Sequence, residues 1–219
     1  SSDTPQNPSS HRDPFGASGD FILEILNDIE ANLRKIHEHG TRADGIVKSM
    51  LEHSRGGSTK PEKVDINDLT EEFVNLSFHG MRAGKRPINV DLQFDLQENL
   101  PEVNLIAKDF SRVLINLCNN AFDAMWEKLQ NVDFEPVLAV STSLKKNKIY
   151  LSVEDNGPGI PDKISAKIME PFFTTKQGTD GTGLGLSITS DIVKAHGGTL
   201  HVESEENQFT KFTVVLPVT

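Results

Sequence analysis

The sequence predicts an α/β chain in two parts: a long coiled-coil-like helix, then a mixed β-sheet with helices on one face. Two observations predict this architecture. Between residues 20 and 54, apolar residues recur at alternating steps of four and three, which is the spacing of a coiled-coil seam. From residue 62 onward, strand-like and helix-like patterns follow one another in an order that is neither regular β-α-β nor strands only. The second part is therefore expected to contain a mixed sheet.

The chain before residue 62 divides into three segments. Residues 1–19 are rich in Ser, Pro, Gly and Asp and are expected to be a flexible tail or linker. Residues 20–55 are expected to form one helix with its seam at Ile22, Leu26, Ile29, Leu33, Ile36, Gly40, Ala43, Val47 and Met50. Such a stripe needs a partner helix from a second chain or a further segment; alternatively, the helix folds back on the second part. Residues 56–61, with two glycines and a proline, are expected to be a hinge.

The compact unit is expected over residues 62–219, and its elements are predicted in order along the chain. They are a strand at 64–66, a helix capped by Asn67 and Asp68 and running to Ala83, a strand at 88–95, a helix at 108–129, strands at 137–144 and 148–154, a helix at 184–196, and strands at 199–203 and 212–216. On the helix at 108–129, the core-facing residues are expected to be Val113, Leu117, Ala121 and Ala124.

Composition excludes several classes of protein. The formal net charge is −10, with 32 acidic against 22 basic residues, so a nucleic-acid partner held through phosphate contacts is not expected. Cys118 is the single cysteine and lies in an apolar helical stretch, which favours a buried thiol. No apolar run reaches the roughly 20 residues of a membrane span. The sequence therefore predicts a cytoplasmic piece that makes no membrane contact, with any span of a parent protein outside it.

Two glycine clusters, Gly157/Gly159 and Gly181/Gly183/Gly185, mark the stretch most suggestive of function. Glycine allows backbone to approach a ligand closely, and such clusters often surround phosphates. The second cluster runs into an apolar helical pattern, which places its amides at a helix N-terminus, a favourable position for an anion. Two clusters with an aspartate before the first predict a nucleotide site.

Polar residues on the helix at 108–129 fit a metal beside that nucleotide. Asn116, Asn120 and Asp123 recur at i, i+4 and i+7 and therefore share one helical face. Amide and carboxylate oxygens suit a hard cation such as Mg²⁺, which also binds substrate phosphates. A stripe of these residues that simply faces solvent is the alternative.

Asp155 and Lys176 are candidates for contacts with the base and the phosphates. Asp155 follows an apolar strand, and a carboxylate there can accept the exocyclic amine of adenine; a turn-forming aspartate is the alternative. Lys176 lies between the glycine clusters, where a cation can reach terminal phosphates. Taken alone, a lysine such as Lys176 is more often an ordinary surface residue.

Four segments together resemble the boxes of sensor histidine kinases. They are N-L-C-N-N-A-F-D-A at 116–124, D-N-G-P-G-I at 155–160, E-P-F-F-T-T-K at 170–176 and G-T-G-L-G-L-S at 181–187. In order, they resemble the asparagine box, the first glycine box, the phenylalanine box and the second glycine box. The resemblance covers about residues 62–219. It implies the Bergerat fold, a two-layer sandwich of a mixed sheet over three helices, with ATP and Mg²⁺ bound under a lid at about 161–183.

The resemblance also implies the residues of the site. Asn120 matches the Mg²⁺-binding asparagine, and Asp155 matches the adenine-binding aspartate. Asp123 stands where several family members carry a basic phosphate contact, a charge that Lys176 could supply instead. The implied catalytic residues are Asn116 and Lys176, and the implied nucleotide-binding residues are Asn116, Asn120, Asp123, Asp155, Gly157, Gly159, Ile160, Phe172, Thr175, Lys176, Gly181, Thr182, Gly183, Leu184, Gly185, Leu186 and Thr210.

Asn116 favours phosphotransfer over hydrolysis. Hydrolytic relatives place a glutamate one turn before the Mg²⁺ asparagine as the general base for water, and an asparagine cannot act as that base. The expected function is therefore a protein histidine kinase of a two-component system, which phosphorylates a histidine and then an aspartate of a response-regulator receiver domain. Two alternatives stay open: a nucleotide-binding scaffold without phosphotransfer, and a hydrolytic ATPase of the same superfamily.

The acceptor histidine is the missing part of this interpretation. The helix at 20–55 resembles the second helix of the dimerisation and phosphotransfer hairpin, which implies a homodimer through these residues. In such kinases the acceptor lies on the preceding helix in a motif like H-E-x-x-N-P, and His11, His39 and His53 have no such context. The acceptor helix is expected to precede this sequence. His37, which is followed by a glutamate, is a weaker candidate.

Overall fold

A computed structural model describes residues 22–23, 25–36, 60–176 and 181–218. Residues 1–19, most of the predicted hinge, and His37, His39 and His53 therefore lie outside the described residues. Residues 25–36 are helical, as predicted. Their seam residues are exposed by 48% at Ile29 to 67% at Ile36, so the compact unit does not cover this stripe.

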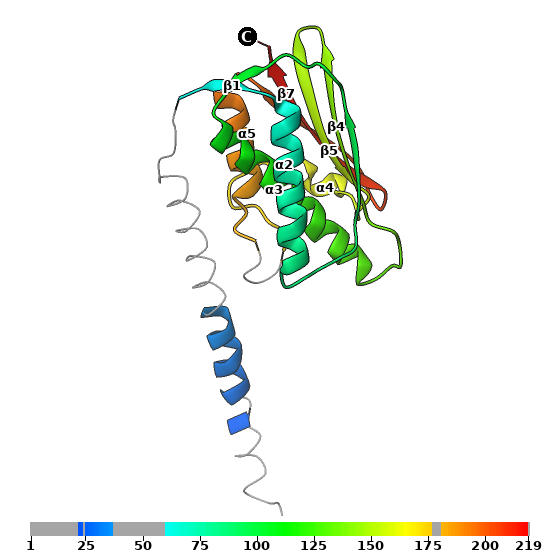
Figure 1. Cartoon of the computed structure of the whole chain (residues 1–219). Helices are drawn as coiled ribbons and strands as arrows, with labels where there is room; N and C mark the ends of the chain where they lie inside the picture. Colours follow the sequence, from blue (N-terminus) through cyan, green and yellow to red (C-terminus); the bar gives the residue numbers. More distant parts are fainter. Residues whose placement is uncertain (1–21, 24, 37–59, 177–180, 219) are drawn as a thin grey trace, which may run out of the picture.

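The compact unit is a five-stranded mixed sheet with three long helices on one face, which confirms the predicted fold class (Figure 1). The strand order is β2-β4-β5-β7-β6, and the strands are β2 (Asp91–Leu96), β4 (Val137–Lys145), β5 (Lys148–Asp155), β6 (Thr199–Glu205) and β7 (Phe209–Pro217). β2 pairs with β4 in parallel, and the other pairs are antiparallel. A separate antiparallel pair joins β1 (Glu62–Val64) to β3 (Val103–Leu105).

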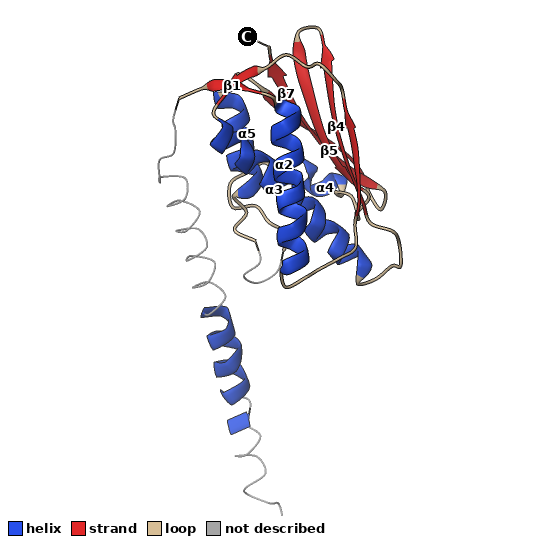
Figure 2. Cartoon of the chain, viewed as in Figure 1, coloured by secondary structure: helices blue, strands red, loops and turns tan. Residues whose placement is uncertain are grey.

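Helices α2 (Ile66–Ala83), α3 (Ala107–Leu129) and α5 (Gly185–Ala195) form the second layer (Figure 2). Side chains from α3 and the sheet make most of the core between the layers, including Phe110, Leu114, Leu117, Leu138 and Leu151, each at most 1% exposed. The buried thiol of Cys118 belongs to this core, and burial raises its pKa to about 12. Because α3 lies between α2 and α5, one of its faces borders the second glycine cluster.

Several predicted boundaries differ from the structure, and two of them have a local reason. Ile66 begins α2 instead of ending a strand, because the Asp65 side chain caps the helix by accepting hydrogen bonds from the amides of Asn67 and Asp68 at 2.8 and 3.3 Å. β2 begins at Asp91 rather than Ile88, because its partner β4 begins only at Val137.

Three further differences concern short elements and one core residue. The sequence patterns did not predict β3 or the short helix α4 (Asp162–Ser165), since elements of three and four residues are too short for a periodic signal. Ala124 was expected in the core, but it lines a cavity beside α3. A tight turn joins β4 to β5 between the two predicted strands, with Lys146 and Asn147 at positive φ.

Candidate nucleotide-binding site

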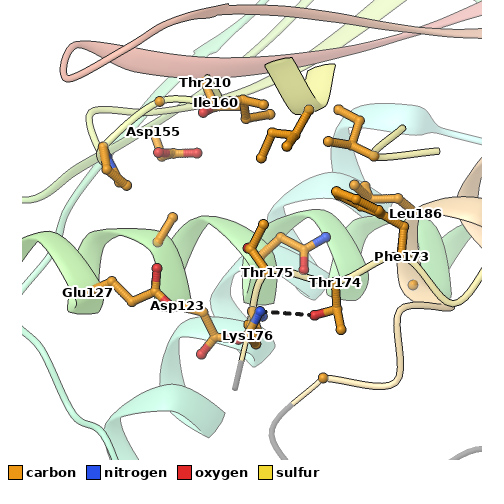
Figure 3. Close-up of a pocket in the computed structure, with 18 of the residues that line it drawn as sticks. Asp123, Glu127, Asp155, Ile160, Phe173, Thr174, Thr175, Lys176, Leu186 and Thr210 are labelled. Carbon is orange, nitrogen blue, oxygen red and sulfur yellow. Dashed lines mark hydrogen bonds and ion pairs between the residues drawn. The ribbon is translucent and has the colours of Figure 1, made fainter. Parts of the chain in front are cut away.

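A cavity of about 620 Å³ lies between α3, the ends of β5 and β7, and the segment that leads into α5. This is within the usual size range of small-molecule sites. Every residue that the sequence assigned to the nucleotide lines this cavity, except Gly157, Phe172 and Leu184. Figure 3 shows Asp155, Ile160 and Thr210 on the sheet side, across from Asp123 and Glu127 of α3.

Asp155 is the buried charge of the cavity. It is the last residue of β5, pairs with Thr210 of β7 and is 4% exposed. Burial raises the pKa of its carboxyl to about 7, against the lowering effects of the hydrogen bond from Gly157 and the charge of Lys128. Within the described residues, the amide of Gly157 is the donor to Asp155, at 2.9 Å from Oδ1. The carboxylate therefore keeps acceptor capacity for a ligand, as recognition of an adenine amine requires.

The first glycine cluster permits close packing around this carboxylate. A Cβ at position 157 would lie 2.5 Å from Oδ1 of Asp155. Gly159 has a φ of +69°, and a Cβ there would lie 2.2 Å from the carbonyl oxygen of Glu205 in β6. Gly157 does not line the cavity, but its lack of a side chain leaves room for the Asp155 carboxylate. Gly159 allows the loop to pack closely against the β6–β7 hairpin.

The polar face predicted on α3 is directed at the cavity. Asn116, Asn120 and Asp123 all line it, together with Asn119, Ala124 and Glu127. The amide nitrogen of Asn116 is 3.3 Å from the carbonyl oxygen of Gly185 and 3.4 Å from the hydroxyl of Thr189, so Asn116 connects α3 to α5. Within the described part of the chain, the side chain of Asn120 has no hydrogen-bond partner, so its amide oxygen is available to a ligand.

At the end of the cavity away from Asp155, Lys176 forms an ion pair with Asp123, with 2.5 Å between Nζ and Oδ2. The two side chains are 23% and 37% exposed. Among the described residues that line the cavity, Lys176 is the only one with a positively charged side chain. Asp123, Glu127 and Glu206 are acidic residues of the same lining. An anionic ligand at this end would compete with Asp123 for the ammonium group.

The second glycine cluster brings a helix N-terminus to the same end. α5 begins at Gly185, and Leu184 at the N-cap position makes no side-chain capping bond. The first amides of α5 are therefore available to an anion. Gly183 has a φ of +68°, and a Cβ there would lie 2.4 Å from the carbonyl carbon of Phe172, so glycine is needed for this close approach.

The structure places the two phenylalanines of the E-P-F-F-T-T-K segment differently from the sequence assignment. Phe172 is 56% exposed with a φ of +67° and does not line the cavity, whereas Phe173 does.

Sequence reasoning also missed lining residues on the sheet side and in the segment around α4, namely Pro158, Pro161, Ile164, Ile168, Glu206, Asn207 and Phe212. An apolar residue in a loop carries no chemical signal for a binding site. The acidic turn E-E-N at 205–207 is a polar signal that could have indicated Glu206 and Asn207.

The fold and this cavity are those of an ATP-binding module, and comparisons with known proteins agree. Residues 106–219 match the family model of "Histidine kinase-, DNA gyrase B-, and HSP90-like ATPase". The catalytic domain of the histidine kinase ThkA superposes with a TM-score of 0.61 and 30% identity, over 74% of this chain and 99% of that one. The chain belongs to this family, and its compact unit is a histidine kinase catalytic domain. Family membership also implies that the cavity binds ATP.

Curated relatives are sensor kinases. The chain is 32% identical to the sensor kinase CckA of Brucella abortus over 85% of its own length and 20% of that protein. It is 33% identical to the sensor histidine kinase ZraS of Escherichia coli over 81% of its length and 35% of that protein. The chain thus spans a fifth to about a third of these relatives. Among the described residues, no helix is long and apolar enough to cross a membrane.

Proposed function

We propose that this chain transfers the γ-phosphoryl group of Mg-ATP to a histidine, and that the group then passes to an aspartate of a response-regulator receiver domain. The observation that carries the proposal is the single cavity that joins Asp155, Asn120 and both glycine clusters. The sensor kinases among the relatives, and the likeness to the ThkA catalytic domain, support the same activity.

In this proposal each end of the cavity binds one end of ATP. Asp155 accepts a hydrogen bond from the adenine amine, which discriminates against guanine because a carbonyl there would face the carboxylate. The phosphates extend toward Lys176 and the N-terminus of α5. Lys176 then leaves Asp123 and pairs with a phosphate oxygen, so its ammonium group exchanges one negatively charged partner for another.

The residues present fit a Mg²⁺ ion that is bound together with the nucleotide. The amide oxygen of Asn120 is unengaged within the described residues and lines the cavity. The described residues contain no group of three or more His, Cys, Asp or Glu that could hold a metal alone. A cation here would therefore be held by Asn120, phosphate oxygens and waters, a common arrangement for Mg²⁺. Bound Mg²⁺ would neutralise phosphate charge during transfer.

The contacts of Asn116 support transfer to histidine over hydrolysis. Its amide nitrogen is directed to Gly185 and Thr189 of α5, and an amide cannot accept a proton from water. Asp123 is close to the phosphate end, but it is paired with Lys176. Catalysis would then depend on positioning and charge neutralisation, with the acceptor imidazole attacking the γ-phosphorus in line.

The domain organisation is part of the proposal. Residues 20–55 would pair with the same helix of a second chain, which would cover the exposed seam residues Ile22, Leu26, Ile29, Leu33 and Ile36. Residues 56–61 would link this helix to the kinase unit at 62–219. The acceptor histidine would lie on a separate helix with an H-E-x-x-N-P-like motif, and His37 is the weaker candidate within the chain.

A labelling experiment tests the proposed activity. The chain is incubated with γ-labelled ATP, Mg²⁺ and a fragment that carries the acceptor helix of a sensor kinase. Label that is stable in base and labile in acid on that fragment is the expected result, since phosphohistidine has this stability. Asn120→Ala is expected to abolish labelling, while Asn104→Ala, at an exposed position of β3 outside the cavity lining, serves as the control.

The other outcomes identify the competing functions. Tight ATP binding without any labelled histidine, on the fragment or on His37, would contradict the kinase and favour a nucleotide-binding scaffold. Steady phosphate release that survives Asn116→Ala and disappears in Asn120→Ala would instead favour a hydrolytic ATPase.

A further inference from the structure

The side chain of Lys128 connects three parts of the chain behind the cavity. It lies in the last turn of α3, and its Nζ donates hydrogen bonds to the carbonyl oxygens of Asn156, Gly157 and Asn207 at 2.7, 3.0 and 3.3 Å. The ammonium also lies 4.6 Å from the centre of the Phe134 ring. An ammonium group has three protons, so three carbonyl oxygens use its donors fully.

These carbonyl groups belong to the two loops that form the base end of the cavity. Asn156 and Gly157 directly follow Asp155, and Asn207 is in the turn between β6 and β7. The loops also bond to each other, through the amide of Asn207 to the carbonyl of Pro158 at 2.6 Å and the amide of Ile160 to the hydroxyl of Ser204 at 2.8 Å. Lys128 adds a link from both loops to α3, which carries the opposite wall.

Lys128 also acts on the charge of Asp155. Its positive charge favours the ionised carboxylate, whereas burial and the neighbouring Glu154 oppose ionisation. Other charged groups around the same cavity are Asp123 and Glu127 on α3, Glu206 in the hairpin turn and Lys176 before α5. Because burial already raises the pKa of Asp155 to about 7, loss of the ammonium would leave more of this carboxyl protonated at neutral pH.

We propose that Lys128 is a positioning residue for nucleotide binding, which holds the Asp155 loop and the β6–β7 turn against α3 and keeps a positive charge beside the base-binding carboxylate. Lys128 is not part of the cavity lining, so it acts through the loops and not by contact with the nucleotide. The inference rests on the proposed function, since it takes Asp155 as the residue that binds the base.

The test measures ADP affinity by calorimetry at pH 6.5 and pH 8.5 for the unmodified chain and for Lys128→Met, Lys128→Gln and Lys128→Arg. Lys128→Met is expected to weaken binding roughly tenfold or more at pH 6.5 and about threefold at pH 8.5, because Asp155 ionises in both proteins at the higher pH. Lys128→Gln keeps a donor without the charge and is expected to show the same pH-dependent difference. Lys128→Arg, which keeps the charge, is expected to stay within about threefold at both values.

Lys145→Met is the matched control, because Lys145 is at the far end of β4 and packs over Tyr150. It removes the same charge and is expected to leave ADP affinity unchanged. Amide hydrogen exchange supplies a second readout, since residues 156–159 and 205–208 are expected to exchange faster in Lys128→Met but not in Lys145→Met.

Lys128→Met or Lys128→Gln binding ADP within twofold of the unmodified chain at both pH values would overturn the proposal. A loss of affinity of equal size at pH 6.5 and 8.5 would overturn its electrostatic part and leave the structural part. Asp155→Asn separates these results from failure of the proposed function. If that variant also binds ADP normally, the base assignment itself is wrong; if it loses binding while Lys128→Met keeps it, only the role of Lys128 is wrong.

Discussion

The two ends of the cavity are held by different kinds of interaction. At the base end, Asp155 is 4% exposed at the end of a central strand, and backbone hydrogen bonds fix the loops around it. At the phosphate end, the described links are the ion pair between Lys176 and Asp123, both partly exposed, and two long hydrogen bonds from Asn116 to Gly185 and Thr189. Buried, hydrogen-bonded groups are held rigidly, whereas partly exposed ion pairs contribute little stability.

This difference predicts a division of work. Under the proposed function, the base end would be preformed and would select the nucleotide without a cost for rearrangement. The phosphate end can exchange the Asp123 carboxylate for phosphate oxygens at low cost, which suits a part of the site that must release a phosphoryl group. Substitutions at the base end should therefore have large effects, and substitutions at the phosphate end small ones.

The largest effect is expected for Asp155→Asn on nucleotide affinity. The amide would present a donor to the adenine amine and remove a charge-assisted hydrogen bond, at a cost of roughly 3 kcal/mol or about 100-fold in Kd. Calorimetric titration with ADP measures this. Asp95→Asn is the control, because it removes the same charge at an exposed position of β2, outside the cavity lining. Equal affinities for Asp155→Asn and the unmodified chain would show that the base does not bind at Asp155.

The same substitution is expected to stabilise the fold at alkaline pH. The Asp155 carboxyl has a pKa of about 7 in the folded chain against an ordinary value of 3.8, so between these values the folded chain holds a proton that the unfolded chain has released. The contribution of Asp155 to stability is therefore present below about pH 4 and lost as the pH rises through 7. The gain of Asp155→Asn over the unmodified chain should be about 2 to 3 kcal/mol larger at pH 8 than at pH 5, as measured by urea denaturation. A gain that does not vary with pH would contradict the buried-carboxylate explanation.

A backbone change at the base end is expected to have an intermediate effect. Gly159→Ala should destabilise the fold by about 2 kcal/mol, since a Cβ at this positive φ would lie 2.2 Å from the carbonyl oxygen of Glu205. Gly80→Ala is the control. It lies inside α2 with no atom within 4 Å of an added Cβ, and should stabilise by roughly 0.5 to 1 kcal/mol. Thermal unfolding of both variants measures the difference, and similar midpoints would argue against a rigid base end.

The smallest effect on stability is expected at the phosphate end. Asp123→Asn should change the free energy of unfolding by less than about 0.5 kcal/mol, because the pair that it breaks is partly exposed. It should also strengthen ATP binding by a few-fold, since Lys176 is then free to meet the phosphates, while Lys176→Met should weaken it about tenfold. Titrations of both variants with ATP test this, and the prediction requires that the two changes in ATP affinity have opposite signs. Destabilisation by several kcal/mol in Asp123→Asn would remove the contrast between the two ends.

Much of this site could be predicted from the sequence because the signals are local. The i, i+4, i+7 spacing of Asn116, Asn120 and Asp123 places them on one helical face whatever surrounds the helix. Alternation predicted β4 and β5 almost to the residue, and the glycine clusters marked the turns where a side chain would not fit. The resemblance to the kinase boxes then placed most of these residues in one cavity.

The tertiary structure decided which groups meet across distance. Adjacent residues in the same segment, Phe172 and Phe173, differ in whether they line the cavity, and only the packing around them separates the two. The partner of Lys176 is 53 residues away, and the carbonyl partners of Lys128 are 28 to 79 residues away. The sequence alone determined most of the elements, most of the candidate site residues and the family, because these follow from spacing and residue type. The burial of Asp155, the ion pair and the Lys128 contacts depend on how the layers pack, since solvent exclusion and hydrogen-bond geometry belong to the folded chain as a whole.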